Sequence, residues 1–452
     1  MMDKFSLKLI FLGLWLTIFL TGGAMSARAA EDMVVVGPEG YGELREAIEE
    51  VNEGGTIVIQ AGQYPVPLLV INKSITICGE AGVILTAAED TTNLGTTTSW
   101  IRVEPGSKVT FENLHLDGSG KNINYALYGG DTVEVKNCSF ANIKYVLNDR
   151  GSAIVLRGDS SLVEGCSFNA IGQSGIYLFA CKNVRLENNT YTGKGDKGGG
   201  PWLEYGIEVA NGTQVTLCGN TITRCTGLSE TSGALSAGIL INTSDPSCPC
   251  HVIIENKNVI QDNLDGIQIG TRDIENSKVE IRGNIITGNI GSALYSYSHE
   301  VSAEGNYWGT TGPVLQGPNK VPAWLDTCPW AADTADENGD GRFDHQIYPL
   351  TLQWSEGGNE LLIRSLEPGA CCDLSFVAQL NERAQETTVT YVLEWTAADT
   401  GNLAGVTVNG ATLQQNRAVI SDTLQPGQAN TCQVEVVITT PGTYNVVLWG
   451  QL

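Results

Sequence analysis

Apolar and polar positions follow a repeating pattern along residues 109–308. A segment of the form Val-x-apolar-x-(Gly/Asn)-(Asn/Cys)-x-apolar recurs at starts 22 to 37 residues apart. A repeat of this length predicts a solenoid, in which each copy is one coil stacked on the previous coil and the longer copies carry loops. The copies begin at Val109, Val133, Ser161, Val184, Val215, Val252, Val279 and Val301.

A second short segment lies between successive copies, and its alternate residues are apolar, as in Ile207 and Val209. This alternation predicts a β-strand with one face turned inward. Such a strand buries that face only by stacking on its equivalents at about 4.8 Å, so each coil is expected to hold at least two strands. These segments span residues 152–156, 174–178, 205–209, 237–241, 265–269 and 292–296.

The turn inside each repeat carries a predicted ladder of side chains. Asparagine suits a tight bend because it tolerates a left-handed backbone, and its amide can bond to the next coil. Two cysteines are expected to stack in neighbouring coils. The favoured interpretation is a buried ladder of free thiols, and a disulfide between them is the alternative. The ladder positions are Leu114, Cys138, Cys166, Asn189, Asn220, Lys257, Asn284 and Asn306.

Both open ends of the solenoid need caps. Residues 40–55 predict an amphipathic helix with Leu44, Ile48 and Val51 on one face and Gly54 as its stop, before a first strand at residues 56–60. At the other end, Asn306-Tyr-Trp-Gly closes the series with bulky aromatic residues.

Four features of the sequence together point to a known family. They are the capping helix, the segments GGTIVIQAGQY and INKSITICGE that follow it, the asparagine-rich coils and the closing GNYWG..GP. The chain resembles the right-handed β-helix repeat proteins of the pectin-lyase-like superfamily over about residues 34–315. The resemblance implies an all-β fold, a right-handed parallel β-helix of about ten rungs over residues 30–315. It specifies the fold more than the activity, because that superfamily includes lyases, hydrolases, esterases, epimerases and proteins without known catalysis.

Residues 316–349 are expected to be a linker with a calcium-loop-like segment. Asp336, Asn338, Asp340 and Asp344 occupy positions 1, 3, 5 and 9 of such a loop, and Gly341 provides the sharp turn. The twelfth position is not acidic, so the usual bidentate ligand is missing. The spacing favours Ca²⁺ as a ligand, and a solvated acidic linker is the alternative.

Residues 350–452 contain about eight strand-sized runs separated by turn clusters, which predicts an immunoglobulin-like β-sandwich. Asn409-Gly410 is a strong hairpin signal. A disulfide between Cys372 and Cys432 across the sandwich is a further expectation.

The first 29 residues predict a signal peptide, because Lys4 and Lys8 precede an apolar run and Ala27-Arg-Ala resembles a cleavage site. Export places the protein outside the cell, on its surface or in the periplasm. The formal charge of −24 becomes −26 when three cations and one anion leave with the signal peptide. This charge argues against nucleic acid or an anionic membrane as partner. Four histidines and four methionines among 452 residues also argue against zinc or copper sites.

The second strand of each coil presents two outward columns of side chains. Tyrosine and phenylalanine beside glutamate, glutamine and asparagine suit sugar rings, which stack on aromatic faces while their hydroxyls bind polar groups. The alternative is that these aromatic residues pack beneath the loops. The candidate glycan-binding residues are Tyr177, Phe179, Glu208, Asn242, Gln268, Tyr295 and Tyr297, with Trp202 from a long loop.

Catalysis has weaker support in the sequence. Arg157 and Arg150 are candidates for a base or charge neutraliser, and Asp149 and Glu208 for holding calcium. The motifs that the superfamily's lyases, polygalacturonase-like hydrolases and esterases would imply are absent. The pairs Asp149-Arg150 and Arg157-Asp159 are more simply explained as surface ion pairs.

Three functions remain compatible with these patterns. The preferred one is a secreted or cell-surface protein that binds a polysaccharide or other glycan, or has a structural role, without catalysis. The first alternative is a calcium-dependent polysaccharide lyase or another polysaccharide-modifying enzyme. The second is self-association into a surface filament or layer.

Overall fold

The computed structural model describes residues 31–451 apart from short internal gaps. The predicted signal peptide, Asp149 and Trp202 lie outside the described residues. Among the described residues, no helix is long and apolar enough to cross a membrane. The gaps are residues 39, 92–98, 146–149, 196–202, 230–233, 272–274, 299, 310–314, 317–329, 332, 345, 348–349, 356, 358–359, 366–369, 381–386, 398–402, 426 and 441.

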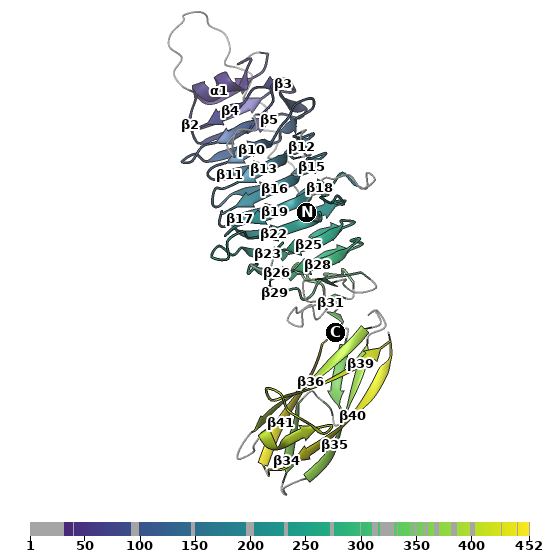
Figure 1. Ribbon diagram of the computed structural model, residues 1–452. Coiled ribbons are helices and arrows are strands. Elements are labelled where there is room, and N and C mark those ends of the chain that lie inside the picture. The colour runs from purple at the N-terminus through teal and green to yellow at the C-terminus, as the bar shows by residue number, and fades with distance from the viewer. Residues whose placement is uncertain are drawn as a thin grey trace, which may run out of the picture.

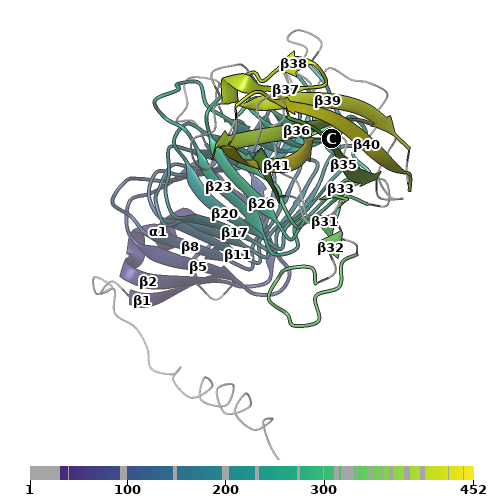
Figure 2. The same cartoon turned by 90° about the horizontal axis from the view of Figure 1, so that it is seen from below.

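The N-terminal part of the chain coils through three parallel sheets, called sheets A, B and C here (Figures 1 and 2). Sheet A has eleven strands: β1 Glu31–Val36, β2 Val51–Ile59, β5 Ile75–Gly79, β8 Val109–Glu112, β11 Val133–Lys136, β14 Leu162–Glu164, β17 Val184–Glu187, β20 Gln214–Cys218, β23 His251–Glu255, β26 Lys278–Arg282 and β29 Val301–Ser302. Sheet B has nine: β3 Gly62–Val66, β6 Val83–Ala87, β9 His115–Asp117, β12 Ser139–Ala141, β15 Ser167–Asn169, β18 Thr190–Thr192, β21 Thr221–Thr223, β24 Val259–Gln261 and β27 Ile285–Thr287. Sheet C has ten: β4 Leu69–Ile71, β7 Ile101–Val103, β10 Tyr125–Gly129, β13 Ser152–Leu156, β16 Ser174–Phe179, β19 Tyr205–Ala210, β22 Ala237–Asn242, β25 Asp265–Ile269, β28 Ser292–Ser296 and β30 Leu315–Gln316.

Alternation along the strands builds one continuous core inside these sheets. In β19, for example, Ile207 and Val209 are buried in the interior while Glu208 between them is only half-buried on the outside. Each strand pairs in parallel with its equivalents in the coils before and after it. The predicted β-helix is therefore confirmed, with three strands per coil, one of which was not separately identified from the sequence.

The predicted ladder is present, with one correction. Asn189, Asn220, Asn284 and Asn306 are buried and joined through Asn258, not through Lys257. The repeat starting at Val252 has one extra residue in its turn, and both Asn256 and Lys257 have positive φ angles (60° and 64°). In the other coils the left-handed residue is the glycine or asparagine that precedes the ladder position, such as Asn188 (φ 55°) or Gly219 (φ 66°).

The N-terminal cap is shorter than the sequence predicted. Helix α1 spans Leu44–Glu50 and buries Leu44, Ala47 and Ile48. The chain then turns directly into β2 at Val51, so that residue belongs to the strand and not to the helix. Strand β1 was missed by the sequence reasoning and pairs in parallel with β2 at the end of sheet A.

Two further antiparallel sheets form a β-sandwich beyond the coils (Figure 1). Trp354, Phe376 and Tyr391 are buried in its core, with ring centroids 5.7 Å and 5.0 Å apart along this series. One sheet holds β33 Leu350–Trp354, β35 Ala370–Leu380, β40 Ala429–Ile438, β37 Val406–Val408 and β38 Ala411–Thr412; the other holds β34 Glu360–Ser365, β41 Gly442–Gln451, β36 Thr387–Ala397 and β39 Arg417–Leu424. The remaining elements are the 3-10 helix η1 Leu403–Gly405 and the paired short strands β31 Trp330–Ala331 and β32 Gln346–Ile347.

The predicted hairpin is confirmed. Asn409 and Gly410 have φ angles of 49° and 76° and connect β37 to β38, where Val408 pairs with Ala411. A two-residue turn with both φ angles positive matches the right-handed twist of the strands that it joins.

Neither of the two disulfides considered from the sequence is present. Cys138 and Cys166 are free and buried, which confirms the thiol ladder over the disulfide. The bridge from Cys372 to Cys432 is wrong, because the register of β35 on β40 pairs Cys372 with Val436 and Cys432 with Phe376. The two cysteines are four residues out of register on neighbouring strands, which is too far for a disulfide.

Candidate functional site

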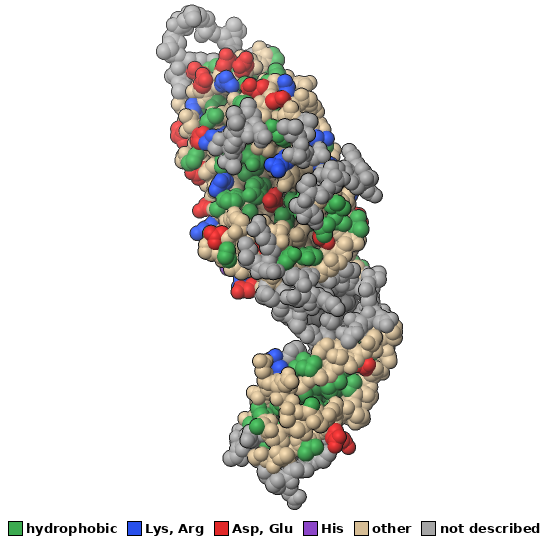
Figure 3. Space-filling model, viewed as in Figure 1, with side chains coloured by type: hydrophobic (Ala, Val, Ile, Leu, Met, Phe, Trp, Pro, Cys, Tyr) green, Lys and Arg blue, Asp and Glu red, His purple; other side chains and the backbone are tan. Residues whose placement is uncertain are grey.

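The outward face of sheet C carries the predicted columns in the predicted register. Tyr177 pairs with Glu208, and the same column continues through Leu240 and Gln268 to Tyr295. In the second column Phe179 is followed by Ala210 and Asn242. The stacking of equivalent strands therefore fixes which of these side chains are neighbours. Figure 3 looks onto this side of the molecule, where hydrophobic side chains gather over the middle coils.

An aromatic surface, which we call the aromatic platform, lies on β16. The ring centroids of Tyr177 and Phe179 are 6.2 Å apart in an edge-to-face arrangement, and both side chains are half-buried. The exposed guanidinium of Arg157 lies 4.3 Å from the Phe179 ring centroid, a cation–π contact. Arg157 was expected to pair with Asp159, but the structure shows its guanidinium on Phe179, while Asp159 accepts the Lys182 backbone N–H at 2.7 Å.

Loops cover part of the same face. Leu240 is 3% exposed and packs with Tyr205, Ala237 and Leu203 in a small apolar cluster outside the coil interior. Gln268, a predicted glycan-binding residue, is 8% exposed. On β22 and β25 the outward side chains are therefore covered, as the alternative interpretation held. The aromatic platform on β16, in contrast, keeps accessible surface.

Glu208 lies beside the aromatic platform and is half-buried. Its Oε2 accepts a hydrogen bond of 2.7 Å from the Ser174 hydroxyl. Burial raises the pKa of the Glu208 carboxyl above its usual range, and the Ser174 hydrogen bond only partly opposes this shift. Burial, followed by the nearby Glu208 charge, also raises the pKa values of Tyr177 and Tyr205. The arrangement places a carboxyl with a raised pKa next to an aromatic surface, within reach of a ligand hydroxyl.

A second carboxyl on this face, Asp265, was missed by the sequence reasoning. It is 1% exposed at the start of β25, and its Oδ1 accepts hydrogen bonds from the Ser292 backbone N–H and hydroxyl at 3.0 Å and 2.6 Å. Burial raises the pKa of Asp265. Among the described residues, its Oδ2 and the Oε1 of Gln268 are buried without a hydrogen-bond partner. The sequence position of Asp265 could have identified it, because β13, β16 and β28 have serine at the equivalent position where β25 has Asp265.

Tyr295 and Tyr297 form a second aromatic pair towards the end of the face. Their ring centroids are 5.6 Å apart and both side chains are half-buried. Burial, the hydrogen bond with Tyr297 and the Asp265 charge raise the pKa of Tyr295 to about 12. Asn242 lies between the two pairs and accepts a hydrogen bond of 3.0 Å from the Thr271 hydroxyl.

The weak catalytic candidates do not gather into one site among the described residues. Arg150 is exposed in an antiparallel bridge with Tyr145, and Arg157 stacks on Phe179. Only Glu208 combines partial burial with a raised pKa. These residues support ligand contact more readily than a complete acid–base pair.

The predicted calcium loop is folded against the coils. The Asp336 carboxylate accepts backbone N–H bonds from Gly339, Asp340 and Gly341, at 2.8 to 3.1 Å, and its Oδ2 lies 2.7 Å from Lys257 Nζ. The hydrogen bond with Lys257 lowers the pKa of Asp336. The extra turn residue that displaced Lys257 from the ladder thus allows it to reach this loop.

The other predicted ligands of the loop also have protein partners. Asp344 Oδ1 accepts a hydrogen bond from the Asn338 amide at 3.2 Å, and Asp340 Oδ1 accepts the Arg342 N–H at 2.9 Å. Across the described part of the chain, no three acidic, histidine or cysteine side chains converge as a metal site would require. The donor set is of the oxygen type that Ca²⁺ prefers, but its carboxylates point to N–H groups and to Lys257.

Comparison with known proteins agrees with this architecture. A family model described as "Right handed beta helix region" matches residues 126–307, which include most of the stacked coils. The stacked coils are a right-handed parallel β-helix. The sequence matches none of the curated proteins with which it was compared.

Solved structures similar to this β-helix come from proteins with divergent sequences. The A-module of the mannuronan C-5 epimerase AlgE4 of Azotobacter vinelandii is 13% identical with a TM-score of 0.41, over 56% of this chain and 69% of that one. The tailspike gp49 of Acinetobacter baumannii bacteriophage Fri1, a capsular polysaccharide depolymerase, is 11% identical with a TM-score of 0.29, over 87% of this chain and 79% of that one. At these identities the likeness is one of fold alone.

The raised pKa of Glu208 predicts a stability effect that depends on pH. Below about pH 4.5 the carboxyl is protonated in both folded and unfolded chains, and the folded chain loses stability as pH rises through the raised folded pKa. Glu208→Gln removes this ionisation and is therefore expected to raise the free energy of unfolding at pH 7. Thermal unfolding from pH 4 to 8 should show the advantage shrinking towards pH 4.

Glu134→Gln is the control with the opposite sign. Hydrogen bonds with Lys108 and Lys136 lower the pKa of Glu134, whose carboxylate lies 2.8 Å and 2.6 Å from their ammonium groups. The ionised Glu134 carboxylate stabilises the folded chain above the pKa that it has in the unfolded chain, and this stabilisation is lost as the pH falls through its lowered folded pKa. Glu134→Gln should therefore be less stable than the parent at pH 7 and should approach the stability of the parent at pH 3. A Glu208→Gln advantage that does not change with pH would contradict a raised pKa.

Proposed function

We propose that this protein is exported and binds a polysaccharide on the outward face of sheet C, without cleaving or modifying it. The observation that carries the proposal is the aromatic platform of Tyr177 and Phe179, flanked by Arg157 and by the half-buried Glu208. Sugar rings stack their apolar faces on such side chains, and their hydroxyls bind to nearby carboxyl and guanidinium groups.

Arg157 and Glu208 give the aromatic platform one cationic and one acidic neighbour. Neutral glycans can use such a combination through their hydroxyls, and glycans that carry carboxylates can bind the guanidinium of Arg157. The net charge, −24 for the full chain and −26 without the predicted signal peptide, opposes tight binding of strongly anionic polymers at low salt. We therefore favour neutral or weakly acidic polysaccharides.

A panel of neutral and acidic polysaccharides tests this function in one experiment. Affinity electrophoresis of the full-length protein, alongside absorbance of unsaturated uronates and reducing-end release, separates binding from cleavage. Retardation by at least one polymer with no new ends or unsaturated products is the expected result. No retardation by any polymer in the panel would count against the proposal.

A polysaccharide-modifying enzyme is the second candidate, and Glu208 is the observation that favours it. A carboxyl with a raised pKa beside a ligand surface can serve as a general acid or base. The exposed Arg150 and Arg157 would then neutralise charge on the substrate. Product formation by the parent and its loss in Glu208→Gln would establish this candidate in place of simple binding.

We further propose that the loop at Asp336–Asp344 binds Ca²⁺ weakly. Its oxygen donors and its turn are of the right kind, but the ion must displace Lys257 from Asp336. Calorimetric titration should give a dissociation constant in the weak range of extracellular sites, about 10⁻⁴ to 10⁻³ M. Asp340→Ala should abolish this uptake, and equal calcium uptake by parent and variant would remove the site.

A further inference from the structure

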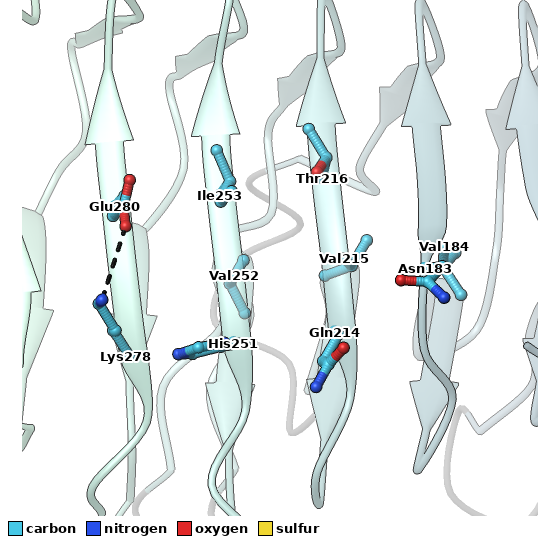
Figure 4. Close-up of a pocket in the computed structure, with 10 residues that line it drawn as sticks. All are labelled: Asn183, Val184, Gln214, Val215, Thr216, His251, Val252, Ile253, Lys278 and Glu280. Atoms are coloured by element: carbon cyan, nitrogen blue, oxygen red, sulfur yellow. Dashed lines mark ion pairs between the residues drawn. The ribbon is translucent and has the colours of Figure 1, made fainter. Parts of the chain in front are cut away.

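The outward face of sheet A carries a shallow groove that the proposed function does not use. It crosses β17, β20, β23 and β26 and encloses about 260 Å³ (Figure 4). Gln214, His251 and Lys278 come from three successive strands and are paired in register. They therefore form a row along the helix axis, with neighbours about 4.8 Å apart at the backbone.

The side chains of this row are exposed and available to a ligand. In the part of the chain that the structure describes, the Gln214 amide and the His251 imidazole bond to no protein group, whereas Lys278 Nζ lies 3.9 Å from Glu280 Oε1. Asn183 lies beside Val184 at the end of the groove, next to this row. The three side chains of the row carry N–H donors at regular intervals, which suits a polymer whose acceptors also repeat at regular intervals.

The side chains at the floor of the groove and the charges around it indicate which kind of ligand fits. Thr216 and Ile253 lie beside the row and offer a hydroxyl and an apolar surface. The Lys278 charge is balanced by Glu280, and Glu280 also pairs with Arg282 at 2.8 Å. A groove with balanced charges, hydrogen-bonding amides and an apolar floor fits a neutral, hydroxyl-rich chain better than a polyanion.

We propose that this groove is a second binding site, for a neutral polysaccharide that lies parallel to the helix axis on sheet A. The Gln214, His251 and Lys278 side chains donate hydrogen bonds to its hydroxyls, and Ile253 packs against a sugar face. Sheets A and C are separate walls of the β-helix, so this site does not depend on the aromatic platform. Two sites on one chain would allow the protein to link two polymer strands or to hold one more tightly.

The His251 ring provides a local readout, because the chain contains only four histidines. Imidazole proton signals of the full-length protein are assigned with His251→Gln and followed during titration with cello-oligosaccharides, manno-oligosaccharides and malto-oligosaccharides. At least one of these neutral series should shift the His251 signals in a saturable manner. Gln214→Ala combined with Lys278→Ala should weaken the response by about tenfold, as expected for two lost hydrogen bonds.

The design separates this proposal from the sheet C site. Tyr177→Ala with Phe179→Ala should leave the His251 response unchanged, even if that variant loses all other glycan binding. Thr76→Ala, on the same face of sheet A but far from the groove, is the matched control for the groove variants. His251 signals that do not move with any of the three neutral series would overturn the proposal.

Discussion

Asn258→Leu is expected to destabilise the β-helix by about 4 kcal/mol, because several buried polar groups would lose their partners together. Asn258 is 0% exposed. Its Oδ1 accepts from the Asn220 backbone and side-chain amides at 2.8 Å and 2.9 Å. Its amide donates to Asn284 Oδ1, at 2.9 Å, and to the Leu217 and Glu255 carbonyls.

Leucine has the same branched side-chain skeleton as asparagine, but its methyl groups are bulkier and can satisfy none of these groups. The melting temperature should fall by roughly 10 °C, measured by calorimetry or circular dichroism. Asn276→Leu is the matched control: Asn276 is exposed and makes one side-chain hydrogen bond, to the Pro246 carbonyl. Its effect should stay within about 0.5 kcal/mol, the usual range for surface positions. Equal melting of the two variants would show that the ladder contributes little to stability.

The double substitution Tyr177→Ala and Phe179→Ala is expected to weaken polysaccharide binding by at least 30-fold. Aromatic side chains at the centre of a binding surface typically contribute about 2 kcal/mol or more each, and about 1.4 kcal/mol corresponds to a tenfold change in affinity. Calorimetric titration with the polymer that retards the parent most strongly measures the change. Because both rings lie on the outside of sheet C, the fold should be retained.

Tyr177→Phe separates stacking from hydrogen bonding at the same position. If sugar rings stack on the aromatic platform, this variant should keep affinity within about threefold of the parent, since it loses at most one hydrogen bond. A loss as large as that of the double substitution would mean that the Tyr177 hydroxyl, not its ring, is the essential contact. Unchanged affinity in the double variant would move the binding site away from sheet C.

Much of the fold was predictable because the repeat forces equivalent residues to stack. The period-2 pattern of the second strands fixed the register of sheet C, and the structure pairs Tyr177 with Glu208 as expected. The errors arose where one residue changes the register. The extra residue in the turn after Glu255 moved the ladder from Lys257 to Asn258, and neither periodicity nor composition shows on which side of the turn an insertion lies.

The candidate site was only partly predictable for a different reason. Which side chains point outward follows from the strand pattern, but which of them a loop covers depends on contacts distant in sequence. Leu203 packs over Leu240, whereas Tyr177 keeps accessible surface, and no local pattern distinguishes these two outward positions. Asp265 was not predicted because it is the first residue of β25, directly after the bend at residues 262–264, and the outward columns were counted from later positions of the strand.

Hydroxyl-radical footprinting of the full-length protein, with and without the retained polysaccharide, tests the sheet C site most directly. Oxidation rates of individual aromatic side chains report their solvent access in the complex. The polymer is expected to protect Tyr177 and Phe179, with no change at half-buried Tyr64 on sheet B. Unprotected Tyr177 and Phe179 in a saturated complex would contradict it.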